Sequence, residues 1–262
     1  MIRHLRLLLL FVRVSLQNDT AYRFDFLLGL ATALFHVGGE LFGLWIIFHN
    51  TRSLAGWSAY QVVVLLGVYR MMSGAINLVI APNMRRVMED VRNGTLDFVL
   101  LKPINNQFYA SCRTFVLPRL ADIVLGLGLA IAGATIQAAL QSAWQVIAFV
   151  VLVAAGVTVI YSVWLALATM TFWTTKMDNI EMVFWNVFEA GRYPIHIYPP
   201  AVRWTLTYVI PLAVIVTLPA GVLVGQTSAI GIVSAVAVAA ATLAAATAFW
   251  RYGLKHYSGA SA

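Results

Sequence analysis

The chain has 262 residues, of which 61% are hydrophobic and only 10% are charged. A water-soluble domain carries about 25% charged residues, so this composition excludes an ordinary soluble domain and indicates one integral membrane domain spanning residues 1–262. The formal charge of +7 does not indicate nucleic-acid binding, because the basic residues collect between apolar segments rather than in one patch. The single cysteine, Cys112, excludes an intrachain disulfide and a cysteine-based metal site.

The first twenty residues predict an amphipathic helix that lies in the plane of the membrane interface. Their apolar core, residues 7–12, is too short for a convincing signal peptide, and Arg13 stops it. On a helical projection Arg3, Arg6 and Arg13 share one sector, opposite several leucines. This pattern fits a helix that anchors the chain and equally one that also touches a partner.

The remaining sequence predicts an all-α membrane protein with six crossings. A span needs about 20 mostly apolar residues, and five segments meet this requirement: residues 24–49, 59–81, 120–140, 146–173 and 229–250. The sixth crossing lies within residues 178–225, where hydropathy favours 202–224 but five prolines break the segment. Helices broken at membrane depth persist only where protein or a water-filled cavity covers the freed backbone groups.

Lysine and arginine counts predict that both termini and the central loop, residues 82–119, are cytoplasmic. Six basic residues lie in the central loop, whereas the connection near Gln141 has none and that near Thr51 has only Arg52. The N-terminal segment and the C-terminal end are also basic.

Two ionisable residues lie deep in the first two spans. Glu40 is about nine residues and Arg70 about twelve residues from the outer loop, a difference in depth of about one helical turn. Because buried charges are costly, we expect these side chains to pair or to face a polar cavity. A structural clamp and a role in the cargo path both remain open. Asp122 is expected to pair with Arg119 at the start of the third span, and the Gly39–Gly43 motif to serve ordinary packing within the chain.

The central loop begins with a predicted short amphipathic helix. Pro82 is expected to end the second span, Asn83 to cap a new helix, and Gly94 to terminate it. Its apolar residues recur at the spacing of one helical face and are Met84, Val87, Met88 and Val91. Its charged residues are Arg85, Arg86, Glu89, Asp90 and Arg92. The stripe could lie on the bilayer, yet acidic residues gain nothing from an anionic membrane surface, so a groove on a partner protein fits better.

The segment after this helix resembles a known family. Residues 92–104 read Arg-Asn-Gly-Thr-Leu-Asp-Phe-Val-Leu-Leu-Lys-Pro-Ile, which is similar to a signature in a less characterised bacterial branch of the ABC-type-two exporter permeases. Residues 191–199, which read Gly-Arg-Tyr-Pro-Ile-His-Ile-Tyr-Pro, together with Arg203 and Pro211, are similar to the family's end of span five. The resemblance covers nearly the whole chain.

The resemblance implies roles for three segments. Residues 84–92, with Gly94 and Asp97, would be the coupling helix that docks on a separate ATPase subunit. Span five would be residues 179–197, and residues 200–225 would hold a re-entrant pair of short extracellular helices broken at Pro211. The implied extracellular gate comprises Tyr193, Pro194, Tyr198, Pro199, Arg203 and Pro211.

The resemblance also implies partners that the chain itself would not replace. The sequence has no G-x-x-x-x-G-K-[ST] phosphate loop, so ATP and Mg²⁺ are expected in a dimer of partner ATPase subunits and no cofactor or metal in this chain. A second permease, identical or a sister chain, is expected, in a bacterial inner membrane. A self-sufficient secondary transporter is the first alternative, disfavoured by the lack of an internal repeat. A membrane-embedded lipid-modifying enzyme is the second, disfavoured because the five histidines are scattered.

Overall fold

The computed structural model describes residues 2–20, 23–136, 142–174 and 178–257, and their regular secondary structure is helical apart from one isolated bridge between Leu54 and Trp57. The α-helices are α1 (Ile2–Thr20), α2 (Arg23–Asn50), α3 (Ala59–Ala75), α4 (Ala81–Arg92), α5 (Leu96–Leu100), α6 (Asn106–Cys112), α7 (Leu120–Ile136), α8 (Ala143–Met170), α9 (Asp178–Glu189), α10 (Pro200–Trp204), α11 (Leu218–Leu223) and α12 (Ala229–His256). The 3-10 turns are η2 (Leu117–Arg119), η3 (Ala190–Arg192) and η4 (Ile195–Ile197), and the π turns are η1 (Ile76–Ile80), η5 (Thr205–Val209) and η6 (Ala213–Thr217).

Five helices in the described part of the chain are long and apolar enough to cross a membrane: Leu28–Asn50, Ala59–Arg92, Leu117–Ile136, Ala143–Met170 and Ala229–His256. Each overlaps one of the five predicted spans with different bounds, and Leu140, the predicted end of the third, lies outside the described residues. A bent pair, Pro200–Val209 and Ala213–Leu223, is a sixth candidate, as either a broken span or a re-entrant loop, with 77° between its halves. The all-α membrane architecture is therefore confirmed, and the sixth crossing stays a prediction.

Pro82 was expected to end the helix of the second span, but it does not break that helix. The helix runs without interruption from Ala59 to Arg92, 34 residues. Pro82 has no N–H to give the Leu78 carbonyl, four residues earlier, but the Val116 N–H donates to that oxygen at 2.9 Å. The wide turn η1, just before the proline, also lets the chain pass it without a break.

Asn83 is a bridge rather than a helix cap. Its side chain is fully buried, and its amide nitrogen donates to the carbonyl oxygens of Val79 at 2.6 Å and Thr114 at 2.7 Å. Its amide oxygen accepts the Thr114 N–H at 3.0 Å.

Since a 34-residue helix is about 51 Å long and the hydrocarbon core is about 30 Å thick, α4 extends beyond the membrane as an arm of α3.

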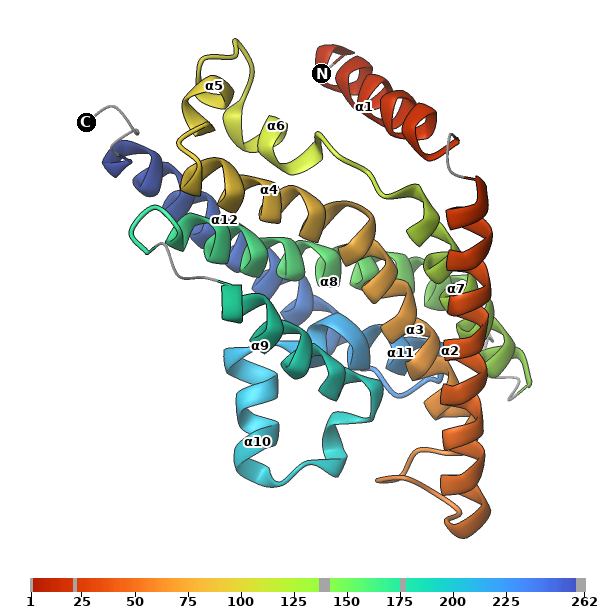
Figure 1. Ribbon diagram of the computed structural model, residues 1–262. Coiled ribbons are helices and arrows are strands. Elements are labelled where there is room, and N and C mark those ends of the chain that lie inside the picture. The colour runs from red at the N-terminus through yellow and green to blue at the C-terminus, as the bar shows by residue number, and fades with distance from the viewer. Residues whose placement is uncertain (1, 21–22, 137–141, 175–177, 258–262) are drawn as a thin grey trace.

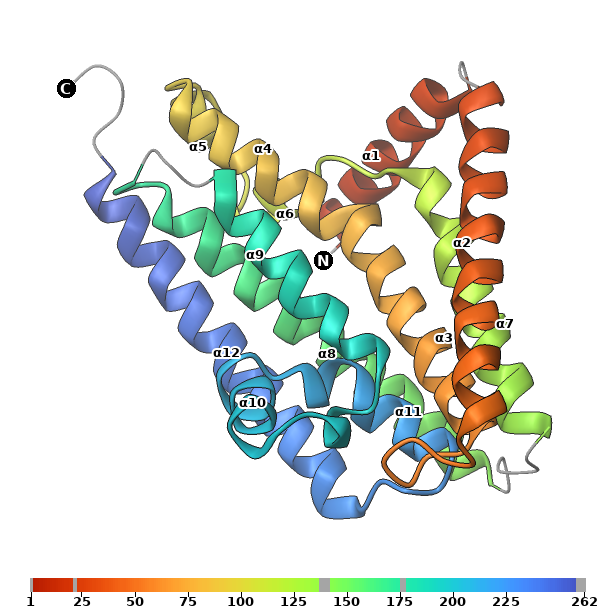
Figure 2. The ribbon, with the colours of Figure 1, turned by 60° about the horizontal axis from the view of Figure 1, so that its bottom comes forward.

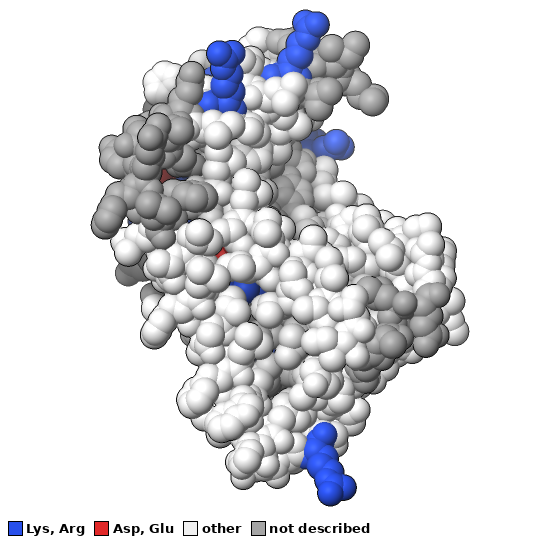
Figure 3. Space-filling view, turned by 90° about the vertical axis from the view of Figure 1, so that its right-hand side faces the viewer, with Lys and Arg blue, Asp and Glu red and all other residues white. Residues whose placement is uncertain are grey.

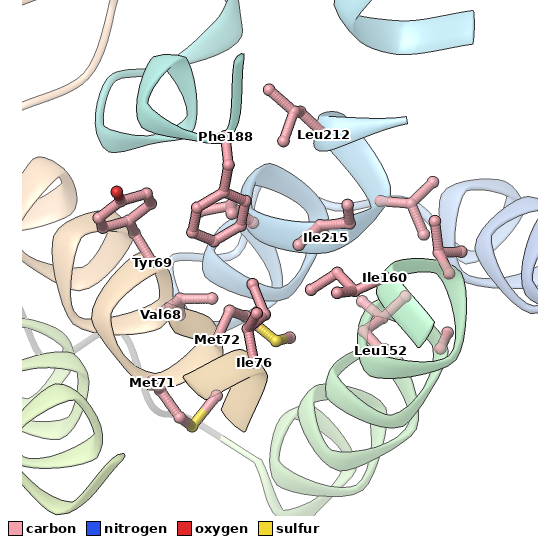
Figure 4. Packing of buried hydrophobic residues seen from close by; sticks show 14 of the residues in the cluster. Val68, Tyr69, Met71, Met72, Ile76, Leu152, Ile160, Phe188, Leu212 and Ile215 are labelled. Carbon is pink, nitrogen blue, oxygen red and sulfur yellow. The ribbon is translucent and has the colours of Figure 1, made fainter. Parts of the chain in front are cut away.

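The core lies around α3. Figure 4 shows Tyr69 and Met72 of α3 and Ile76 of η1 facing Leu152 of α8 and Phe188 of α9, with side chains of η6 closing the cluster. The rings of Tyr69 and Phe188 stack with centroids 4.9 Å apart. On its other side α3 packs directly against the backbone of α7: a Cβ at Gly67 would lie 2.5 Å from the Gly126 carbonyl oxygen. This backbone-to-backbone approach requires glycine.

Helix α2 stands at the edge of the bundle, beside α3 and α7 (Figures 1 and 2). Its glycines were expected to pack within the chain, but a Cβ at Gly39 or Gly43 would meet no described atom within 4 Å. That expectation is therefore wrong, because this face of α2 borders an open recess rather than a closely packed helix.

Helix α1 lies at the end of the molecule that also carries α5 and α6, at a steep angle to α2 (Figures 1 and 2). Its predicted helical structure is confirmed. Phe11 meets the Tyr109 ring edge-on, with centroids 5.8 Å apart, and the Ser15 hydroxyl accepts the Phe115 N–H at 3.3 Å. Its position in the interface plane stays a prediction.

Candidate functional site

The first candidate site is an ion cluster centred on Arg70, in the middle of α3. Its guanidinium donates to the Glu40 carboxylate of α2 at 3.2 and 3.3 Å, and to Asp122 of α7 at 2.8 Å. The three side chains are 9%, 15% and 16% exposed. The expected contact between Glu40 and Arg70 is thus present, and a second carboxylate completes it.

The cluster extends to the segment after α9. Arg192 lies 3.9 Å from Glu40 and 3.1 Å from Glu189, and its guanidinium sits over the Tyr69 ring at 5.4 Å. Arg119 reaches Asp122 at 3.6 Å. Charges from α2, α3, η2, α7 and the α9–η3 turn therefore alternate in sign, which compensates each buried carboxylate.

Sequence reasoning assigned Asp122 only to Arg119 and missed its bond to Arg70. The first turn of α7 lies level with Gly74, where a Cβ would be 3.1 Å from the Asp122 Cβ. The segment before α7 is hydrogen-bonded to η1 through Val116 and to α4 through Thr114, so α7 starts near the depth of Arg70. An acidic residue in the first turn of a span was the available signal.

A recess of about 320 Å³ borders this cluster and is lined by His36, Glu40, Arg192 and Tyr193 among others. Figure 3 shows the face that carries α2: its middle is nearly free of charge apart from a small recessed spot of red and blue, while basic side chains gather at the upper end. The geometry suits a clamp that joins three helices, and the open side of the recess leaves the role in a cargo path as a prediction.

The second candidate site is the arm formed by α4 and α5. The apolar stripe expected to face a partner is turned inward: Met84 is 0% and Val87 is 1% exposed, and Met88 packs against the same core. These side chains therefore cannot form a docking surface while the arm is folded onto the bundle. The correction follows from the continuity of α3 and α4, which holds the arm against α8 and α6.

Salt bridges fasten the arm on both sides. Arg85 donates through its Nε to Glu181 of α9 at 2.8 Å, and the Glu181 carboxylate also accepts from the indole of Trp185 at 3.2 Å. Asp90 binds Arg113 at 2.5 Å. The other charged residues of α4, which are Arg86, Glu89 and Arg92, are exposed. Val91 and Asp97 are half-buried.

The tip of the arm carries the exposed apolar residues that sequence reasoning did not single out. Gly94 turns the chain with φ +67°, as expected of a helix-terminating glycine. In α5 and the residue after it, Leu96 and Val99 are buried, whereas Phe98 is 69% and Leu101 80% exposed. A helical projection of residues 96–101 alone would have separated the two faces.

The segment 193–203, which holds all the predicted gate residues except Pro211, lies at the opposite end of the molecule from α5 (Figure 1). The Tyr198 hydroxyl donates to the Ala190 carbonyl at 3.0 Å, and Arg203 donates to the carbonyls of His196 at 2.9 Å and Tyr198 at 3.3 Å. Pro194 is buried, Tyr193 and Pro199 are exposed, and Pro211 stands at the bend between η5 and η6. No group of three metal-ligating side chains occurs among the residues that the structure describes.

These features define a multi-pass helical membrane protein, with a charged cluster inside the bundle and a helical arm outside it. The family model described as "ABC-2 family transporter protein" matches residues 34–261, nearly the whole chain. The chain therefore belongs to the ABC-2 transporter family and is a membrane permease of that family. Comparison with curated proteins gives no match to the chain.

Proposed function

We propose that this chain forms one half of the translocation pathway of an ATP-driven exporter, and that a separate ATPase subunit docks on α5. ATP and Mg²⁺ would be bound by that subunit, at the cytoplasmic face of a bacterial inner membrane, where both termini of this chain also lie. The family supports transport. The observation that carries the docking proposal is the exposure of Phe98 and Leu101 at the tip of a charged arm.

An exposed aromatic side chain beside an exposed leucine is typical of an anchor that fills a pocket on a partner. Leu96 and Val99, on the other face of α5, are buried and hold the short helix on the arm. Exposed Lys102, which directly follows Leu101, can supply part of the polar rim that such interfaces have. The proposed contact is therefore on α5 rather than on the buried stripe that begins at Met84.

The arm is built to transmit motion from this contact into the membrane. Because α3, η1 and α4 are one continuous helix, a displacement of α5 moves α3, which carries Arg70. The bond from Arg85 to Glu181 passes the same displacement to α9, whose far end leads to Arg192. The ATPase would thus act on the ion cluster through two helices.

We further propose that residues 200–225 form a re-entrant helix pair on the external side and that a second permease, identical or a sister chain, covers α2. The second part is supported by the open glycine face of α2, where a Cβ at Gly39 or Gly43 would meet no described atom within 4 Å. For the first part, a cysteine at the exposed Trp204, in a Cys112→Ser background, should react with an impermeant maleimide from the side opposite α5. Labelling only from the α5 side would contradict the re-entrant arrangement.

The docking proposal is tested with Phe98→Asp and Leu101→Asp in the full-length protein, purified from its native membrane with its associated ATPase. Loss of an interface anchor costs about 2 kcal/mol or more, so affinity should fall at least roughly 30-fold for each change. The measurement is the ATP hydrolysis that co-purifies with the permease, together with the yield of folded permease.

Two matched variants serve as controls. Phe98→Leu keeps an apolar anchor and should retain most of the co-purified ATPase activity. Arg52→Glu changes an exposed charge in the loop between α2 and α3, far from α5, and should have no effect. Full ATPase recovery with the doubly substituted Phe98→Asp and Leu101→Asp protein would rule out docking at α5.

A further inference from the structure

A second recess, of about 650 Å³, lies on another part of the molecule, between η1, α6, α8 and α12. None of its lining residues belongs to the Arg70 cluster or to the exposed face of α5. Its size is that of small-molecule sites, which are commonly about 300–1,000 Å³. Most of its wall is apolar, formed by Val79, Ile80, Phe108, Val157 and Leu243.

Four uncharged polar side chains meet in this recess. Gln107 of α6 donates through one end of its amide to the hydroxyls of Tyr161 on α8 at 3.1 Å and Thr247 on α12 at 3.2 Å. Ser111, one turn later on α6, lies 2.8 Å from the Tyr161 hydroxyl. Three separate helices thus bring hydrogen-bonding groups to one point of an apolar wall, as specific ligand sites do.

The hydrogen bonds leave capacity for a ligand. The Ser111 hydroxyl donates to the backbone carbonyl oxygen of Gln107 at 2.6 Å, so in its hydrogen bond with Tyr161 the phenol is the donor. The side-chain amide nitrogen of Gln107 donates to both hydroxyls, and its side-chain amide oxygen has no hydrogen bond among the described residues. The Thr247 hydroxyl accepts from Gln107, and its own hydrogen likewise has no acceptor among the described residues. An acceptor and a donor therefore remain side by side.

The charge of the recess restricts what can bind. No Lys, Arg, His, Asp or Glu is among its described lining residues. The cations nearest in sequence, Lys102 and Arg113, lie over the ring of Tyr109, which meets α1 through Phe11. A phosphate or ammonium headgroup would lose its hydration here without gaining a counter-charge. A hydroxyl group, in contrast, can both donate and accept.

The depth of the recess points to a lipid. Tyr161 and Thr247 each lie nine residues before the end of their helix, at Met170 and His256. Each of these 28-residue helices is about 42 Å long and overhangs a hydrocarbon core of about 30 Å. The recess is therefore level with the leaflet on the side of α5. Ala244 and Ala248, on either side of Thr247, are exposed, so the recess borders the surface that lipid covers.

We propose that this recess binds an uncharged lipid with a hydroxyl headgroup, of the diacylglycerol class, taken laterally from the leaflet on the α5 side. The hydroxyl binds between Gln107 and Thr247, and an acyl chain lies along Val157 and Leu243. The proposal is independent of ATPase docking, because the recess is formed by this chain alone.

Cys112 provides the test, since it lines the recess and is the sole cysteine of the chain. The full-length protein is reconstituted in phosphatidylcholine vesicles with or without dioleoylglycerol, and the reaction of Cys112 with N-ethylmaleimide is followed by mass. Burial raises the pKa of the Cys112 thiol, so the pH is held constant and mildly alkaline. Dioleoylglycerol should slow the reaction about fivefold, which corresponds to about four-fifths occupancy.

Three comparisons make the result specific. Dioleoylphosphatidylglycerol has the same chains with a charged headgroup and should give no protection. Thr247→Val and Gln107→Leu remove the polar partners at nearly constant volume and should abolish protection, whereas Thr242→Val, whose hydroxyl binds its own helix at Val238, should retain it. A Cys112→Ser, Ser234→Cys protein, with the thiol at an exposed site elsewhere on α12, reports any general effect of the lipid on thiol reactivity.

Equal protection by both lipids, or equal slowing at Ser234→Cys, would overturn the proposal. A further contradiction would be a slow reaction of Cys112 in phosphatidylcholine alone that becomes faster when the protein is diluted to one copy per vesicle. A second protein chain, rather than a lipid, would then occupy the recess. Unchanged reactivity with dioleoylglycerol would overturn it directly.

Discussion

The Arg70 cluster and the Arg85–Glu181 bridge are made of the same side-chain types, but they differ in solvent exposure. Arg70 and its two carboxylates are at most 16% exposed, whereas the side chains of Arg85 and Glu181 are 44% and 29% exposed. The first joins helices inside the bundle, and the second joins the arm to α9 outside it. Burial, rather than the residue types, sets what each contributes.

In the interior, an ion pair gives little net stability, yet the loss of one partner leaves the other charges buried without compensation. At the surface water replaces a lost partner, so a bridge adds about 1 kcal/mol or less. We therefore expect the cluster to be required for folding and the bridge to matter for the position of α9. Substitutions at the two places separate these roles.

The largest effect is expected for Arg70→Gln. Glu40 and Asp122 would both lose their main counter-charge while remaining inside the bundle, with a destabilisation of about 3–5 kcal/mol. The thermal unfolding midpoint in detergent and the yield of monodisperse protein measure this loss. An unfolding midpoint equal to that of the unmodified protein would contradict the clamp.

Neutralising the carboxylates as well should restore folding in steps. The double variant Glu40→Gln with Arg70→Gln should recover only part of the stability, because Asp122 would keep only Arg119, at 3.6 Å. Adding Asp122→Asn should recover most of the remainder. If the triple variant is folded but transports nothing, the cluster also takes part in the cargo path.

An intermediate effect is expected for Gly67→Ala at the crossing of α3 and α7. The new Cβ would lie 2.5 Å from the Ala130 nitrogen and the Gly126 oxygen, so two backbones must separate, at a cost of about 1–3 kcal/mol. Gly128→Ala on α7 is the matched control: its Cβ would meet no described atom within 4 Å, and alanine favours a helix by up to about 1 kcal/mol. Unfolding midpoints should fall for the first and stay equal or rise for the second.

The two glycine sites also show what the sequence can and cannot tell. A small-residue spacing marks close helix packing, but it does not say which of several such glycines is used. Gly39 and Gly43 match the familiar four-residue spacing, yet a Cβ at either would meet no described atom within 4 Å, whereas Gly67 and Gly126 lie on different helices and meet. Only the tertiary arrangement pairs residues so far apart in the chain.

Local patterns predicted the spans, the pair between Glu40 and Arg70, and the turn at Gly94. Each of these depends on hydropathy, on helical rise or on a single backbone conformation. The path through Pro82 was not predictable, since the N–H that replaces the missing donor comes from Val116, 34 positions later. The inward orientation of Met84 and Val87 was also not predictable, because amphipathicity shows that one face of a helix is covered but does not show which element covers it.

The smallest effect on stability is expected for Arg85→Gln, and this variant best distinguishes a role in stability from a role in positioning α9. The exposed bridge should contribute about 1 kcal/mol or less, within the range of ordinary surface substitutions. If the arm moves α9 through this bridge, however, ATP hydrolysis should persist while transport decreases, since α5 is untouched. Glu181→Gln should give the same separation of hydrolysis from transport, because it removes the same contact from the other side. The exchanged pair, Arg85→Glu with Glu181→Arg, should restore transport. Its failure to do so, with both single variants impaired, would show that each residue acts elsewhere and that α4 and α9 are not linked here.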